Sequence, residues 1–287
     1  MKNETIRIAM TRHISASVGS LKGNVWEPTT NTSVVLPQAT IRQNAEVDQS
    51  GTPYAGASYI YDVWVSVSPE TYNSLDILIN EVKDSLMDNI LMIKDVPHYI
   101  QYTGSSTEDM YLEDWDAYSR SITLQVHALD WVLEKVSDPS PVQALIEYSR
   151  DNFRDAQLDP YIWDPKETAP ALYWRQGDVE VDQKESWGAW YTATIHGHII
   201  SPSSAETKMM SDLVVRQMGL DRRTYMSDQS PISFEDIKSD IGYDPFSQGQ
   251  ITVTVRFGLL QDRPAKREIN VYIRDRDKIT SHIKGGD

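Results

Sequence analysis

Apolar and polar side chains alternate along several segments of the chain, the pattern expected of β-strands with one buried face. In the segment Ala57–Val67, the side chains predicted to face a core are those of Tyr59, Tyr61, Val63, Val65 and Val67. In the segment Ala189–Ile200 they are Tyr191, Ala193, Ile195 and Ile199, with His196 and His198 predicted to face outward. Shorter alternations over residues 122–128 and 251–257 predict two further strands, each closing one half of the chain.

Helical periodicity appears between these strands. Leu75, Leu78, Ile79, Val82 and Leu86 form a stripe that follows Ser68 and Pro69, which predicts a capped helix covering a sheet face. Three other helices are predicted. The first is short and capped by Asn3, the second runs from Pro141 to about Gln157, and the third runs from Pro202 to Met218 with Gly219 as its C-terminal cap. Residues 104–115 are predicted as a polar, acidic loop. This order predicts an α+β fold with antiparallel sheets flanked by helices.

One stretch of the chain occurs twice. The sequence RQNAEVDQ at Arg42–Gln49 returns as RQGDVEVDQ at Arg175–Gln183, and DAYSRSITLQV at Asp116–Val126 returns as DPFSQGQITVTV at Asp244–Val255. Matches in the same order at nearly one offset predict a tandem duplication of a single domain. The alternative is one larger α+β domain with coincidental short matches.

The duplication predicts a first copy at 1–136, a linker at 137–141, a second copy at 142–261 and a C-terminal extension at 262–287. The linker contains two prolines, so we expect it to be short and stiff and to hold the copies in a set orientation. In the extension, Ile269, Val271 and Ile273 alternate with polar residues. This pattern predicts a β-arm that joins a sheet edge, with a neighbouring subunit favoured over its own chain.

The overall charge narrows the range of functions that the chain can have. The formal net charge is −15, so the chain as a whole repels phosphate and is not expected to bind DNA specifically. Such acidity serves solubility, or lines a passage through which a polyanion slides. The chain has no cysteine, which excludes disulfides and thiolate chemistry, and neither a transmembrane segment nor a signal peptide is expected.

The sequence contains few residues in patterns typical of catalytic or metal-binding sites. His196 and His198 have metal-competent spacing on a strand, but no third ligand lies nearby in the sequence. Asp178, Glu180 and Asp182 alternate on the repeated stretch, as the hydrated face of a strand or as the wall of a channel that repels DNA. The phosphate-binding, dinucleotide-binding, nucleophile-elbow and zinc-protease motifs are absent from the sequence. We therefore expect no enzymatic activity, catalytic residue, metal or cofactor.

The order of elements in each copy resembles that of the tail terminator proteins of long-tailed bacteriophages. The resemblance rests on the alternating strand Tyr59–Val67, the Ser68-Pro69 helix start, and the polar loop that leads through Asp116-Ala117-Tyr118-Ser119 into SITLQV. The second copy repeats it with Ser201-Pro202 and QITVTV. The resemblance implies a small α/β domain that assembles as a ring, caps the tail tube, ends tail polymerisation and offers a surface to the head.

The family has one such domain, whereas this chain has two. Three chains could supply six domains to one ring, or six chains could form two layers, and we favour the hexamer because the copies have diverged. The implied partners are other copies of the chain, the tail tube protein and head connector or neck proteins, with the tail sheath as a further candidate. DNA would pass through without specific binding. The implied location is the virion, after assembly in the host cytoplasm.

Trp64 and Trp190, both predicted on outward strand faces, are candidate interface anchors along with Ile269, Val271 and Ile273. The alternative is that each tryptophan covers a helix of its own domain. The sequence is also compatible with three other functions: a head–tail connector or neck adaptor, a non-viral two-domain adaptor, and a hydrolase that uses the carboxylates with His196 and His198.

Overall fold

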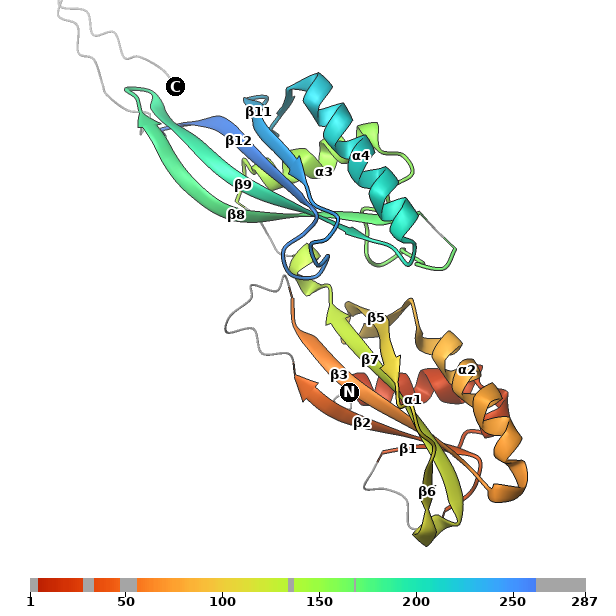
Figure 1. Ribbon diagram of the computed structural model, residues 1–287. Helices are drawn as coiled ribbons and strands as arrows, with labels where there is room; N and C mark the ends of the chain where they lie inside the picture. The colour runs from red at the N-terminus through yellow and green to blue at the C-terminus, as the bar shows by residue number, and fades with distance from the viewer. Residues whose placement is uncertain (1–4, 28–33, 47–55, 134–136, 168, 262–287) are drawn as a thin grey trace, which may run out of the picture.

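The structure, a computed structural model, describes residues 5–27, 34–46, 56–133, 137–167 and 169–261. Its elements form two units on either side of the predicted linker, each a curved sheet with helices against one face (Figure 1). The first unit consists of α1 (Ile6–Ser17), β1 (Val25–Trp26), β2 (Gln38–Glu46), β3 (Ser58–Val67), α2 (Leu75–Leu86), β4 (Asn89–Ile93), β5 (Val96–Ser105), β6 (Met110–Leu112) and β7 (Ala117–Ala128). The second consists of α3 (Pro141–Asn152), β8 (Ala171–Lys184), β9 (Gly188–Ile200), α4 (Ser204–Asp221), β10 (Arg223–Tyr225), β11 (Pro231–Ser239) and β12 (Ile251–Leu260).

The two sheets share one strand order. The first is β1-β2-β3-β7-β5-β4, with β6 beside β7, and the second is β10-β11-β12-β9-β8. Read from its β8 edge, the second sheet repeats the path β2-β3-β7-β5-β4 of the first, with a helix after the second strand in both. All described pairings between strands are antiparallel except that of β1 with β2. The predicted α+β class, with two antiparallel sheets flanked by helices, is confirmed; the predicted arm at 262–287 lies outside the described residues.

Each unit has its own apolar core between sheet and helices. In the first unit the predicted α2 stripe is fully buried, and it packs on the face of β3 that carries Tyr61, Val63 and Val65. In the second unit Ala193 and Ile195 of β9 are buried, as predicted, beneath α3 and α4. The period-2 and period-3.6 patterns therefore identified the inward faces correctly, because burial of apolar surface is what both patterns record.

Several predicted boundaries were wrong. Ser68 and Pro69 begin a 3₁₀ segment, Pro69–Ser74, and the α-helix starts only at Leu75. Helix α3 ends at Asn152 rather than near Gln157, and β6 lies inside the predicted loop.

Helix α4 runs past Gly219 to Asp221, and Arg222 takes the left-handed cap conformation at φ 60°. The Asp221 carboxylate accepts hydrogen bonds from the Tyr148 hydroxyl at 2.6 Å and from Gln217 at 2.9 Å. These contacts hold the last turn of the helix, and the first is a tertiary contact that local sequence signals do not reveal.

A third buried cluster joins the two units. It combines residues of the first unit with residues of the second: Tyr99, Leu129, Trp131, Trp163, Ala171, Tyr173, Ile200 and Phe246. The Phe246 ring stacks on His127 with centroids 3.7 Å apart and planes 9° apart, and it also stacks on Tyr99 at 5.5 Å. Because these rings are buried from water, they fix the orientation of the units, whatever the stiffness of the linker.

The loop before β12 positions Phe246 locally. The side chain of Asp244 accepts hydrogen bonds from the backbone N–H of Phe246 at 3.1 Å and from the Ser247 hydroxyl at 2.8 Å. Gly249 closes the loop at φ 75°, a left-handed conformation that glycine adopts without strain. The motif DPFSQG therefore builds a rigid turn that presents one aromatic ring to the other unit.

We predict that Phe246→Ala destabilises the chain by about 3 kcal/mol or more, because it leaves a cavity in the aromatic cluster. Tyr243→Ala, in the same loop but with a side chain that is 45% exposed, should change the free energy of unfolding by less than about 1 kcal/mol. Urea unfolding of both variants measures the difference. Equal losses of unfolding free energy in the two variants would show that the stacked ring contributes no more to stability than an exposed side chain of the same loop.

Candidate assembly surface

The two copies of the repeated stretch lie on equivalent outer edges, β2 and β8. At the start of each edge a short partner is present: β1 pairs with Ala39 and Thr40, and Gln157 bridges to Ala171. Beyond these points, Arg42–Glu46 and Arg175–Lys184 have no strand on their outer side among the described residues. Residues 47–49 of the first stretch lie outside the described part. The repeat thus marks the open edges of the two sheets.

The three candidate carboxylates are exposed on the β8 edge. Glu180 pairs in register with Thr192 of β9, on the sheet face away from the helices. Two β-bulges interrupt the register, between Gln176 and Val179 and between Val181 and Gln183. Asp182 reaches Arg256 on that outer face, with an Arg256 Nε to Asp182 Oδ2 distance of 2.8 Å. Whether this acidic row faces a lumen remains a prediction.

The opposite face of β8 carries an apolar pair that is not among the candidate residues predicted from the sequence. Val179 and Val181 pair in register with Ala193 and Tyr191, so they point to the core side of the sheet. They are nevertheless 42% and 50% exposed, since β8 and β9 extend beyond the helices that cover the rest of this face (Figure 1). The alternation in DVEVD was visible in the sequence, but the exposure depends on where the helices end.

Trp190 lies half-buried on the outer face, near the end of β8 and the start of β9. The Arg256 guanidinium sits 4.7 Å from its ring centroid, and Trp187 meets it edge-on at 5.4 Å. Arg256 thus links the indole to the carboxylate of Asp182. A cation held over an aromatic ring is stabilised by about 0.5–1 kcal/mol at such a partly exposed position.

Trp64 lies half-buried on the outer face of the first sheet, where it lines a pocket of about 500 Å³. The walls come from strands and from the 3₁₀ turn Glu113–Trp115, not from a helix. Neither tryptophan therefore covers a helix in the way the alternative interpretation required. Ile269, Val271 and Ile273 lie outside the described residues.

The structure buries one of the two candidate histidines of β9. His198, predicted to face outward, is fully buried, because Trp131 of the first unit and the loop before β12 cover this end of the sheet. Its Nδ1 donates to the Pro245 carbonyl at 2.6 Å, and its Nε2 accepts from Arg175 at 3.3 Å. Burial lowers the pKa of His198 to about 3, so it is neutral. No group of three metal-ligating side chains occurs among the described residues.

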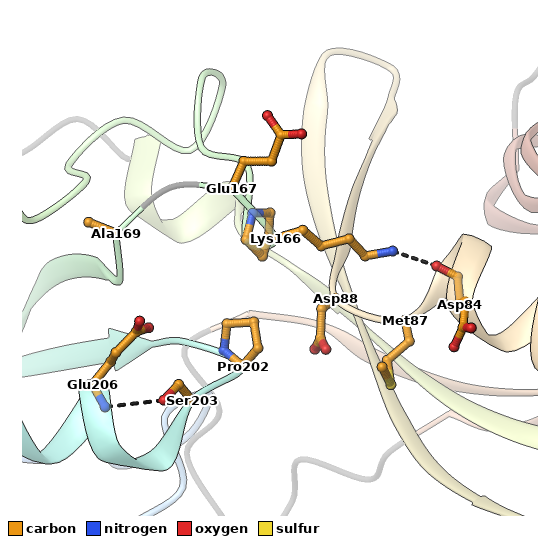
Figure 2. A pocket seen from close by; sticks show the side chains of 10 residues that line it. Asp84, Met87, Asp88, Lys166, Glu167, Ala169, Pro202, Ser203 and Glu206 are labelled. Atoms are coloured by element: carbon orange, nitrogen blue, oxygen red, sulfur yellow. Dashed lines mark hydrogen bonds between the residues drawn. The ribbon is translucent and has the colours of Figure 1, made fainter.

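A pocket of about 740 Å³ lies where the two units meet (Figure 2). Lys166 of the second unit crosses it and donates a hydrogen bond to the backbone carbonyl of Asp84 in the first. Tyr161 makes a similar bond to the carbonyl of Asp95 at 3.1 Å. Both hydrogen bonds run from the second unit to the first, so the pocket belongs to the joint between the units. In the part of the chain that the structure describes, no helix is long and apolar enough to cross a membrane.

No protein-family model matches the chain, and no curated protein matches it. Among solved structures, one similar chain is described as the virion of a native gene transfer agent particle; it is 13% identical, with 43% of this chain and 93% of that chain covered and a TM-score of 0.37. A second solved chain is 14% identical, with 46% and 96% covered and a TM-score of 0.32. TM-scores below 0.5 support no functional assignment.

The joint between the units should weaken in mild acid. Burial lowers the pKa of His127 and of His198 to about 3, whereas an unfolded histidine titrates near 6.5. The unfolded chain therefore binds more protons below about pH 6.5, and the stability present above that pH is lost progressively as the pH falls toward about 3.

We expect the urea midpoint to fall between about pH 7.5 and about pH 5, and the fall to be smaller in a His127→Gln, His198→Gln double variant. Urea titrations of both proteins at the two pH values make the comparison. An identical fall in the double variant would assign the acid sensitivity to other groups.

Proposed function

We propose that this protein is a structural component of a phage virion, which caps the tail tube as a ring, ends tail polymerisation and provides the surface for head attachment. The observation that carries the proposal is the joining of two like α+β units end to end by a buried aromatic cluster, with an open edge strand on each sheet. Such a rigid unit with unpaired edges suits assembly with further copies. The family resemblance of each unit supports the same function.

The contact between the units supports an assembly of six chains in two layers rather than a single ring made by three chains. The repeat aligns ITLQV at Ile122–Val126 with ITVTV at Ile251–Val255, which places Arg256 at the position of His127. In the first unit this position holds a neutral, buried ring that stacks on Phe246. In the second it holds a cation paired with Asp182.

Burying that cation beneath another aromatic loop would cost several kcal/mol without a new partner. The intrachain contact therefore does not recur between chains. A ring of six equivalent domains from three chains would need the same contact between the end of one chain and the start of the next. An open-ended fibre would need it too, because repeated contacts between unlike ends extend without closing. Two stacked layers need it once per chain.

The ring and its role are tested together by native mass, negative-stain images and mixing with purified tail tubes. We expect closed rings, alone or on tube ends, with a mass of six chains, and tubes that no longer elongate once capped. A mass of three chains would contradict the layered arrangement. Binding to head connectors without any effect on tube growth would favour the neck adaptor instead.

The exposed acids predict how DNA behaves at this surface. If the row of Asp178, Glu180 and Asp182 faces the lumen, replacing all three with lysine should leave folding intact and make assembled protein retain DNA in a salt-dependent way. Filter binding at low and high salt measures the retention.

The matched control has the same change of charge at three other exposed acids, Asp151, Asp212 and Glu235. Retention by the control alone, or by both variants equally, would place the row outside the lumen.

A further inference from the structure

The open part of β8 combines three features that favour an added strand. Among the described strands, the backbone of Arg175–Lys184 pairs only with β9, so backbone donors and acceptors along its other side face outward. One face of this edge carries the exposed pair Val179 and Val181, and the other carries the acidic row. A strand that pairs here would need apolar side chains at alternate positions and basic residues nearby.

The C-terminal extension has this pattern. Ile269, Val271 and Ile273 share one face of a seven-residue alternation, Glu268–Arg274. The segment Arg263–Arg274 contains four basic residues and one acidic residue, which complements Asp178, Glu180 and Asp182. These residues lie outside the described part of the chain, so the match rests on their sequence and on the geometry of the edge.

The chain leaves the second sheet at the same end. Strand β12 ends at Leu260, which is 77% exposed, and the N–H of Gln261 donates to the Trp187 carbonyl at 2.8 Å. Trp187 lies in the turn between β8 and β9, so Gln261, the last described residue, lies beside the tip of that hairpin. The residues from Gln261 to Glu268 reach about 23 Å when extended, and three strand spacings amount to about 14 Å.

We infer that the segment Glu268–Arg274 adds to β8 as a further strand, with Ile269, Val271 and Ile273 beside Val179 and Val181. This pairing covers the exposed valines and satisfies the outward backbone groups of the edge. The equivalent edge in the first unit provides a precedent, because β1 already pairs with the start of β2. The inference does not depend on tail capping, since it concerns only two segments of this chain.

Disulfide trapping tests the pairing directly, because the natural chain has no cysteine. Val181→Cys is combined in turn with Ile269→Cys, Val271→Cys and Ile273→Cys in the full-length protein, which scans the register in steps of two residues. The matched controls combine Val181→Cys with Asn270→Cys or Tyr272→Cys, which place the second thiol on the opposite face. Opposed side chains on one face of a pair lie within disulfide distance, and those on opposite faces do not.

We expect at least one of the same-face variants to form several-fold more disulfide than either control. A product of twice the chain mass would show that the segment pairs with a second copy, and a faster-migrating single chain would show pairing with its own edge. Both results support the assignment. Equal trapping in the same-face and opposite-face variants, or none in any of them, would overturn it.

Hydrogen exchange gives a second measurement that needs no substitution in the edge. Deleting Asp262–Asp287 should leave both units folded, because no described core residue is lost, and should speed amide exchange in Arg175–Lys184 several-fold. Strand β10, at the other edge of the same sheet, provides the internal control. Unchanged exchange along β8 after the deletion would contradict the pairing.

Discussion

The stack of Phe246 on His127 is the contact on which the arrangement of this protein depends. It places the loop before β12, in the second unit, against the C-terminal end of β7, the equivalent strand of the first unit. Buried rings from both units surround it, so the relative orientation is fixed by packing rather than by the linker. That orientation decides which surfaces are used up inside the chain and which are left for other molecules. It also requires a neutral imidazole, which ties the joint to pH.

The two units share one sheet topology but have different ends. In the first unit, the end of the closing strand carries His127 and Leu129 and is covered by the second unit. In the second unit, the corresponding end carries Arg256, which binds Asp182 and lies over Trp190. The change from imidazole to guanidinium at one aligned position therefore leaves the second unit without the neutral ring that stacks on Phe246 in the first.

The open end of the second sheet combines several exposed features. An edge strand, two exposed valines, a row of carboxylates and a pair of tryptophans lie within the same hairpin and its neighbour β12. Edge strands that stay unpaired invite association, and proteins either protect them or use them. Carboxylates repel the phosphates of DNA, and exposed valines offer apolar contact to an alternating strand, so this edge suits the partner strand inferred above better than it suits DNA.

The sequence by itself determined the α+β class, the inward faces of the main strands and the α2 stripe, because local periodicity directly reflects which side chains leave water. It also marked both open edges, through the repeated stretch at Arg42 and Arg175. Only the tertiary structure decided that His198 is buried while Val181 is exposed, because each depends on what a distant segment covers. The end of α4 at Asp221 and the Phe246 stack were hidden for the same reason: both involve partners far away in the sequence, which no local pattern encodes.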